Sequence, residues 1–510
     1  MNIRRINLLL VNAKSAPDDT YIKERKFQLF PFSIGYLYNY IKKNDVCDVD
    51  FLDLELKPID TLWHDVRTNK YDLIGFTSTT EARFDTIDKI LMVKSMSPEV
   101  KIVVGGQFFS VTADDALRSV SEIDFIVRGE GEQTLSELVE TLSEGKNDYS
   151  EINGLSYRIQ DRIIHNPNRK PETNLDKYLI DYSLFANLGY DYLFPFRNFT
   201  TDDTMRSFIL DLGRGCSNHC IFCTVNFHLY RPLKLTSVIA QINWVMNNLN
   251  TKYFTFADPS FTERPKFVTE LCQYLIDNNY DIQWWCEVRA DTPVELLTLM
   301  QRAGCISTQF AVESGSDKVL TILKKKLNLQ QIESFAKACH NLGIRAVYNV
   351  MFSMPEETPE DCEKTLEVIK MLYKYEMEPV SVQPLVIYPG TELYDMSVRK
   401  GIIPENFSWF DRSYKCNYKY ILPGKTHMPH YLDTEYLSES QVQYYLNKVI
   451  KDREEYYNKK YFGERSIIHS IKQFKRHMDK ARTLNDVIQA LKRTALFLTY
   501  KIRGLVDKGQ

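Results

Sequence analysis

Short apolar runs alternate with stretches of helical periodicity along most of this chain, and this alternation limits its possible folds more than any other feature. Within residues 1 to about 145, strand-like runs at 6–11 and 73–77 are separated by segments such as 32–42, where apolar residues recur at helical spacing. Strands that alternate with helices predict a parallel sheet with helices on its faces. The sequence therefore predicts an α/β fold that begins with a Rossmann-like, doubly wound parallel sheet.

The same alternation returns between residue 207 and about residue 400. About six strand–helix units fit into this stretch of roughly 190 residues, whereas a closed barrel of eight units needs about 250. We therefore expect a partial (β/α)6 barrel of the TIM type. The predicted organisation is an N-terminal domain (1–145), a connector with a small hairpin (146–205), the barrel (206–400) and a mostly helical C-terminal region (401–510).

Composition excludes several classes of protein. The net charge is −3, from 64 Lys and Arg against 67 Asp and Glu, so the chain as a whole has no basic excess for binding nucleic acid. No apolar run approaches the roughly 20 residues of a transmembrane helix, and residues 1–12 resemble a first strand more than a signal peptide. Ten cysteines, three of them clustered, fit a reducing compartment, so we expect a cytoplasmic protein.

The clustered cysteines are Cys216, Cys220 and Cys223, in a C-x-x-x-C-x-x-C loop directly after a strand-like run. Three thiols in one loop can surround a soft metal centre. An iron–sulfur cubane normally takes four thiolates, so three would leave one iron for a non-protein ligand. Phe222 could place a flat apolar face beside that iron. A zinc site or buried free thiols are the alternatives, although zinc sites usually close four ligands and His219 lies between two thiols in the same turn.

This loop resembles the cluster loop of the radical S-adenosylmethionine (SAM) superfamily, whose signature is C-x-x-x-C-x-aromatic-C. The resemblance implies a [4Fe–4S] cluster at the three cysteines, with SAM bound to the open iron and cleaved to a 5′-deoxyadenosyl radical. It also implies SAM contacts from Phe222 and, in a segment similar to the superfamily's E-S-G-S motif, from Glu313 and Ser314. A reductant such as flavodoxin or ferredoxin would deliver the electron.

Two other barrel segments resemble superfamily motifs with changes. Asp258 begins a segment similar to D-D-x-F-T, but Pro259 replaces the second Asp, so a role shared by two carboxylates is not expected there. Ser353 and Glu356 stand where relatives have the glycines of G-x-P-G-E-T, which argues against close backbone approach to a ligand at that turn.

The predicted N-terminal strands end in small and polar residues. Ligands of such sheets bind beyond the carboxyl ends of the strands, and glycine there lets a bulky ligand approach the backbone. No G-x-G-x-x-G follows the first strand, so a dinucleotide is not expected. The candidate binding residues at these strand ends are Thr77, Ser78, Gly105, Gly106, Gly129 and Glu130.

Placed before a radical SAM core, this region resembles the cobalamin-binding domain of B12-dependent radical SAM enzymes, with similar stretches at 31–37, 103–107 and 124–132. The D-x-H-x-x-G motif, whose histidine ligates cobalt in classical B12 enzymes, is absent at the corresponding residues 52–57. Many radical SAM members also lack it and bind cobalamin without that histidine, while some relatives bind no cobalamin.

The two resemblances together imply an enzyme that methylates a small molecule with the help of cobalamin. The alternatives are a non-methylating radical cyclisation, oxidation or rearrangement, as in the anaerobic porphyrin-ring cyclases, and a sensor without catalysis. No motif in the sequence names the substrate. Residues 465–510 hold eleven Lys and Arg against three Asp, so this basic tail could bind a membrane surface, although a solvated helical tail is the more common form.

Overall fold

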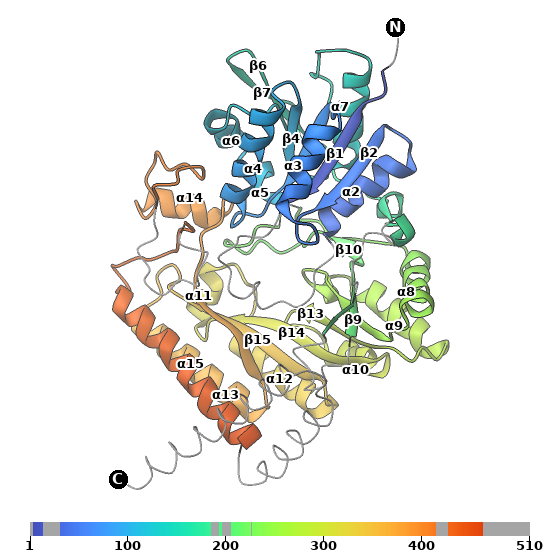
Figure 1. Ribbon diagram of the computed structural model, residues 1–510. Coiled ribbons are helices and arrows are strands. Elements are labelled where there is room, and N and C mark those ends of the chain that lie inside the picture. Colours follow the sequence, from blue (N-terminus) through green and yellow to red (C-terminus); the bar gives the residue numbers. More distant parts are fainter. Residues whose placement is uncertain are drawn as a thin grey trace, which may run out of the picture. The chain divides into compact units, whose positions relative to one another are not determined.

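The first sheet of the computed structural model has seven strands in the order β2-β1-β3-β4-β5-β6-β7, and the strands from β2 to β5 in this order run parallel (Figure 1). The strand order reverses at β1, which lies between β2 and β3. The predicted doubly wound sheet is therefore confirmed. The structure describes residues 4–13, 31–184, 193–195, 206–225, 227–414 and 427–462.

The elements of this N-terminal region alternate as the sequence pattern predicted, except that the pattern missed the short helices α3, α5 and α6. They are β1 (Asn7–Asn12), α2 (Phe32–Lys43), β2 (Asp48–Asp53), α3 (Ile59–Thr68), β3 (Leu73–Thr77), α4 (Arg83–Met96), β4 (Lys101–Gly105), α5 (Gln107–Val111), α6 (Ala113–Ser119), β5 (Phe125–Val127) and α7 (Gly131–Ser143).

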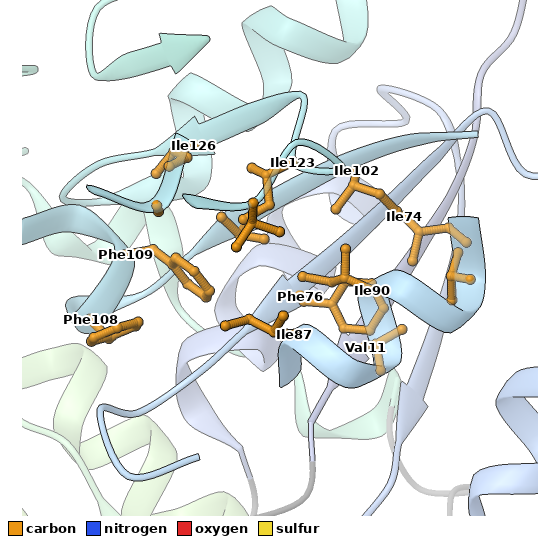
Figure 2. Close-up of a cluster of buried hydrophobic side chains, with 14 of the residues drawn as sticks. Val11, Ile74, Phe76, Ile87, Ile90, Ile102, Phe108, Phe109, Ile123 and Ile126 are labelled. Atoms are coloured by element: carbon orange, nitrogen blue, oxygen red, sulfur yellow. The ribbon is translucent and has the colours of Figure 1, made fainter. Parts of the chain in front are cut away.

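Helices pack on both faces of this sheet because its central strands are apolar on both faces. In β1, Leu8 and Leu10 belong to the core that α2 and α7 cover, whereas Leu9 and Val11 belong to the core that α3 to α6 cover. Figure 2 shows the second core, in which Phe76 of β3 lies among aliphatic side chains of the neighbouring strands and helices. Because helices cover both faces of the sheet, its carboxyl edge is where a ligand can bind.

The predicted hairpin forms, but it extends the N-terminal sheet instead of standing apart as a connector. Its strands are β6 (Leu155–Ile159) and β7 (Arg162–His165), and β6 pairs antiparallel with β5. The 3-10 turn η1 (Leu175–Tyr178) follows.

The second sheet has the order β16-β15-β14-β13-β12-β9-β8. Its strands from β9 to β16 run parallel, and the short β8 pairs antiparallel with β9. Within the described residues β8 and β16 do not pair with each other, so the predicted open barrel with six parallel strands is confirmed. The antiparallel β8, which comes from the aromatic-rich connector, was not predicted.

The elements of the barrel region follow the predicted alternation of strands and helices, with short additional elements between them. They are β8 (Leu193–Pro195), β9 (Arg206–Leu210), β10 (Gly213–Arg214), β11 (Arg231–Pro232), α8 (Leu235–Leu249), β12 (Tyr253–Phe256), η3 (Phe261–Glu263), α9 (Pro265–Asp277), β13 (Gln283–Val288), α10 (Val294–Arg302), β14 (Cys305–Glu313), α11 (Asp317–Ile322), α12 (Leu329–Leu342), β15 (Arg345–Phe352), α13 (Pro359–Lys374), β16 (Glu378–Pro384) and α14 (Glu392–Arg399).

Residues Met1–Tyr445 form one compact unit, and Leu446–Gln510 form a second. The helix α15 (Glu439–Phe462) crosses this boundary, and the basic tail at 465–510 lies outside the described residues. In the part of the chain that the structure describes, no helix combines the length and the apolar character that crossing a membrane requires.

Candidate functional site

The cysteine loop is closed at its base by a short antiparallel ladder. Strand β10 precedes Cys216 and pairs with β11, which opposes Arg214 to Arg231. Gly215 has a φ of +91°, and an added Cβ would lie 2.3 Å from the carbonyl oxygen of Leu229, so only glycine fits at this crossing. The backbone N–H of Cys216 donates to the carbonyl of Phe227 at 3.0 Å. These contacts fold residues 215–230 back on themselves.

The three thiols take no part in disulfides and differ in exposure. Cys216 is buried, Cys220 is half-buried and Cys223 is exposed. Among the described residues no three His, Cys, Asp or Glu side chains are grouped as they would be around one metal ion. A four-iron cluster places each thiolate on a different iron, so its ligands need not meet at one point. The three thiols in one closed loop therefore suit a cluster better than a single ion.

Glu263, which the sequence analysis missed, holds the start of this loop. Its carboxylate accepts a hydrogen bond from the backbone N–H of Ser217 at 3.1 Å, another from the Ser217 hydroxyl, and one from the Asn218 amide at 3.3 Å. The same Asn218 amide nitrogen lies 3.3 Å from Sγ of Cys216. Such outer contacts fix the direction of a metal-binding side chain.

The middle of the loop faces a buried ion pair at the carboxyl end of β14. Nζ of Lys325 lies 2.9 Å from Oε1 of Glu313, and both side chains are buried. The same ammonium lies 5.8 Å from the ring centroid of Phe222. Burial alone would lower the pKa of Lys325, but the Glu313 carboxylate outweighs burial and raises that pKa. At Cys220 burial raises the pKa of the thiol, while the charge of Lys325 acts in the opposite direction.

The structure separates the two residues predicted from the E-S-G-S motif. Glu313 follows a register shift between β14 and β15 and has a φ of +61°, a left-handed conformation that turns its side chain toward Lys325. Ser314 is fully buried and its hydroxyl lies 3.4 Å from that of Thr365 on α13. Ser314 therefore shapes the turn, whereas Glu313 faces the cysteine loop.

A cavity of about 340 Å³ opens at the carboxyl edge of the N-terminal sheet. Five of the six predicted residues of this edge line it: Thr77, Gly105, Gly106, Gly129 and Glu130. Ser78 does not; its hydroxyl donates to the Thr79 carbonyl at 2.9 Å and accepts from Thr86 at 3.0 Å. The cavity lies beside β1 and β3, where the strand order reverses.

Glycine gives this cavity its room. Gly106 has a φ of +88° and a ψ of −179°, and an added Cβ would lie 2.6 Å from Oγ1 of Thr77. Apolar side chains such as Leu10 and Val103 form much of the wall, and the lining residues include no histidine. Asp53, from the segment that replaces D-x-H-x-x-G, lies outside the lining and accepts a hydrogen bond from Asn12 at 2.8 Å.

A second cavity of about 370 Å³ lies between the cysteine loop and the N-terminal domain. Cys220 and Cys223 line it from the loop, and Ser110 and Gly129 line it from the N-terminal domain. Gly129 borders both cavities. Cys220, Cys223 and the edge of the N-terminal sheet therefore border the same second cavity.

Two carboxyl groups lie at the mouth of the barrel, the buried Asp258 and the half-buried Asp211. Asp258 accepts a hydrogen bond from the Tyr230 hydroxyl at 2.9 Å and one from the backbone N–H of Leu212 at 3.3 Å. Burial, reinforced by the charge of Asp211, raises the pKa of Asp258 to about 7. Burial likewise raises the pKa of Asp211 to about 6, against the opposing charge of Arg214. Asp211 lines the first cavity, so its carboxyl group, with a pKa of about 6, can change protonation there near neutral pH.

The glycine positions that this chain replaces keep the backbone conformation of glycine. Ser353 has a φ of +66° and Glu356 a φ of +58°. Each costs about 1–2 kcal/mol because a Cβ crowds the left-handed region. The turn therefore keeps its shape without glycine and encloses the fully buried Glu357.

Two sequence families match this chain. The family described as "B12 binding domain" matches residues 19–139, and the family described as "Radical SAM superfamily" matches residues 210–369. The first match includes the elements from α2 to most of α7, and the second runs from the end of β9 to most of α13. The strands β1, β6, β7, β8 and β16 lie outside both matches.

Among similar proteins, an uncharacterized methyltransferase of Pyrococcus horikoshii is 27% identical over 73% of this chain and 79% of its own length. An anaerobic magnesium-protoporphyrin IX monomethyl ester cyclase of Rubrivivax gelatinosus is 25% identical over 67% of this chain and 62% of its own length. Among solved structures, the radical SAM methyltransferase TsrM of Kitasatospora setae, with cobalamin and a [4Fe-4S] cluster bound, superposes with a TM-score of 0.67 at 16% identity. That superposition covers 87% of this chain and 91% of the other.

Proposed function

Because the chain belongs to the radical SAM superfamily and carries a B12-binding domain before the radical SAM core, we propose that it is a cobalamin-dependent methyltransferase of a small molecule. The observation that carries this proposal is the second cavity, which Cys220 and Cys223 line from one side and Gly129 from the other. Gly129 also borders the first cavity. A substrate in this space would lie between the cysteine loop and the edge of the N-terminal sheet.

The cysteine loop fits a [4Fe–4S] cluster held by Cys216, Cys220 and Cys223. Its three free thiols leave one coordination site for SAM. The buried pair of Lys325 and Glu313 suits the amino-acid end of SAM, because the ammonium attracts a carboxylate and the carboxylate accepts hydrogen bonds from an amino group.

The first cavity fits cobalamin, because its apolar walls and its Gly106 turn leave room for a flat, bulky group. The described residues of its lining include no histidine for cobalt, so we expect binding to rest on shape and hydrogen bonds. When bound, the cluster supplies the electron that cleaves SAM and cobalamin supplies the methyl group, while the protein positions and shields both.

The chain's own residues would orient the bound groups and control protons near them. Glu263 fixes the direction of Cys216 through Asn218, and Lys325 keeps a positive charge beside Phe222. Asp211 lines the first cavity, and its raised pKa allows it to accept or release a proton at neutral pH.

Anaerobic reconstitution with iron, sulfide and hydroxocobalamin tests this function. We expect about four irons and one cobalt per chain after desalting, and 5′-deoxyadenosine when SAM and a reductant are added. Changing Cys216, Cys220 and Cys223 to Ala should abolish SAM cleavage, whereas Cys47→Ala, in the core of the other domain, should not. Retained cleavage in the triple variant would refute the cluster assignment.

A second candidate is a radical oxidation or cyclisation without methyl transfer. The similarity to the cyclase of Rubrivivax gelatinosus favours it, because the two proteins are 25% identical over 67% of this chain. Product mass separates the two functions: methylation adds one methyl group, whereas cyclisation removes hydrogens. Iron without cobalt in the reconstituted protein would also favour this second candidate.

We further propose that a low-potential protein such as flavodoxin or ferredoxin reduces the cluster, and that the enzyme works in the cytoplasm. Ten cysteines, of which none of the described ones forms a disulfide, support a reducing compartment. Reduction rates measured with purified flavodoxin and ferredoxin would test the first part of this proposal.

A further inference from the structure

Four charged side chains join the cysteine loop to the N-terminal domain; those of Arg231, Glu130 and Glu132 are buried and that of Arg214 is 22% exposed. Arg214 donates to Glu130 at 3.2 Å and to Glu132 at 2.8 Å. Arg231 donates to both carboxylate oxygens of Glu130, at 2.9 and 3.0 Å. The set contains two positive and two negative charges and is therefore neutral as a whole. Ion pairs removed from water in this way tolerate little displacement, because an unpaired buried charge is costly.

The carboxylate of Glu130 has no acceptor site left for a ligand. Its Oε1 accepts from Arg214 and from Arg231, and its Oε2 accepts from Arg231 and from the backbone N–H of Glu172 at 2.9 Å. A carboxylate offers about four acceptor positions, and these four bonds use them. Glu130 lines the first cavity, but its chemistry is directed at the cysteine loop.

The two arginines hold the loop at its base. They stand opposite each other in the β10–β11 ladder, and Arg214 lies two residues before Cys216. The guanidinium of Arg214 also lies 4.5 Å from the ring centroid of Tyr36, which lines the first cavity. Glu130 and Glu132 flank the first residue of α7, at the rim of the same cavity. One rigid set of contacts therefore connects the cavity rim with the cysteines.

We propose that Arg214 and Arg231 are positioning residues that hold the cysteine loop in register with the cavity rim through Glu130 and Glu132, so that binding at the cysteines and binding in the cavity are energetically linked. The proposal rests on the function proposed above, because it takes the loop as the cluster site and the cavity as the cobalamin site. Linkage of this kind is reciprocal: if one ligand raises the affinity for the other by some factor, the second ligand raises the affinity for the first by the same factor.

The test removes one charge in the N-terminal domain and reads the effect at the cluster. Glu132→Gln keeps the length of the side chain but removes its charge, so Arg214 loses one ionic partner. Glu132 lies in a different domain from the cysteines. The full chain is reconstituted with iron and sulfide but without cobalamin. The affinity for SAM is then measured by calorimetry on the oxidised cluster, which does not cleave SAM, and the electron paramagnetic resonance signal of the cluster is recorded after reduction. We expect SAM to bind about fivefold or more weakly, with a changed cluster signal.

Glu140→Gln is the matched control, since Glu140 lies on the same helix α7 and contacts Ser136 instead of the loop. It should leave SAM affinity and the cluster signal as in the wild type. Arg214→Lys keeps the charge but loses the paired donors of the guanidinium, so it should weaken SAM binding in the same direction. If Glu132→Gln does not fold, as judged by its melting curve, Arg214→Lys gives the answer.

The outcomes separate this inference from the proposed function. Unchanged SAM affinity in both Glu132→Gln and Arg214→Lys overturns the inference, whatever the protein does with cobalamin. If these variants bind SAM more weakly but the wild type takes up no hydroxocobalamin, the link between the cysteine loop and the cavity rim is supported and the cobalamin assignment is rejected. If the wild type binds hydroxocobalamin with an affinity that depends on the cluster, and Arg214→Lys reduces that affinity, the inference and the proposed function are both supported.

Discussion

At the scale of single residues, two buried ionisable side chains, Glu357 and Lys325, differ in whether a neighbouring group compensates for their removal from water. Glu357 is fully buried in the turn after β15, and one of its carboxylate oxygens, Oε1, has no hydrogen-bond partner in the described residues. Burial raises its pKa to about 8. Lys325 shows the opposite case, a buried charge that keeps its ionic form because Glu313 lies beside it.

The titration of Glu357 should make stability depend on pH. Its pKa rises from an ordinary 4.5 to about 8 on folding, so the folded state holds the proton more tightly. This group's contribution is complete below about pH 4.5 and is lost by about 1.4 kcal/mol per pH unit as pH rises toward 8. In Glu357→Gln the fall in urea midpoint between pH 6 and pH 8 should be smaller than in the wild type. Parallel slopes for the two proteins would contradict this assignment.

Lys325 should contribute to SAM binding through its charge. In Lys325→Met the cation is removed from beside Phe222 and Glu313 is left unpaired, so SAM should bind about tenfold or more weakly. Lys324→Met is a close control, because Lys324 pairs with Glu392 in an exposed ion pair one residue earlier. Equal SAM affinities in the two variants, measured by titration of the reconstituted protein, would show that the buried pair does not face SAM.

Gly106 should be needed for hydroxocobalamin binding, because it leaves space beside Thr77 at the first cavity. Gly106→Ala places a Cβ 2.6 Å from Thr77 and strains the backbone by roughly 1–3 kcal/mol. Affinity for hydroxocobalamin should fall together with the melting temperature. In Gly145→Ala the residue also has a positive φ, +67°, but the added Cβ meets nothing within 4 Å, so only stability should fall. Equal hydroxocobalamin affinity in the two variants would remove Gly106 from the site.

At the scale of elements, helix starts and strand ends place the functional groups. The helix α12 begins with a full capping box, in which Asn328 accepts from the backbone N–H of Gln331 and the Gln331 side chain accepts from that of Asn328. This box fixes the end of the segment that carries Lys325. We expect Asn328→Ala to reduce the free energy of unfolding by about 1 kcal/mol, and the exposed change Gln330→Ala to cost much less. Urea titrations measure both, and equal losses would argue against the capping role.

Element types were largely predictable from the sequence, because apolar periodicity reports burial directly. The six parallel barrel strands and the N-terminal sheet follow from that periodicity. The pattern did not reveal β8, whose three residues are too few to show a period. It also assigned the hairpin to a connector, since strand pairing with β5 depends on contacts distant in sequence.

The candidate site was predictable only where chemistry is local in the sequence. Three cysteines in one loop are visible as a motif, whereas Glu263 reaches the loop from 46 residues away through Ser217. Lys325 lies in a run of three lysines that looks like ordinary surface. Its burial depends on the turn at Glu313, which brings the two side chains together. Proximity of this kind arises from the barrel, not from the local pattern.

At the scale of the whole molecule, ligand binding should be visible as added stability. A ligand that binds only the folded state adds about 2.7 kcal/mol at a free concentration one hundred times its dissociation constant. The melting temperature of the wild type should therefore rise with hydroxocobalamin concentration, and the rise should need more ligand in Gly106→Ala. A melting temperature that stays constant up to millimolar hydroxocobalamin would exclude the first cavity as its site.

The open second sheet also affects the range of substrate sizes that a barrel of this kind can accommodate. Within the described residues β16 pairs with β15 and β8 pairs with β9, and the two edges are not bonded to each other. The girth of a closed barrel is set by its strand number and stagger, and widening it means breaking a ladder. An unclosed sheet has no such fixed circumference, so an edge strand can shift outward while every existing pair stays intact. Reactants of very different size can then be accommodated by a shift of an edge strand, while the other strands and the cysteine loop stay in place.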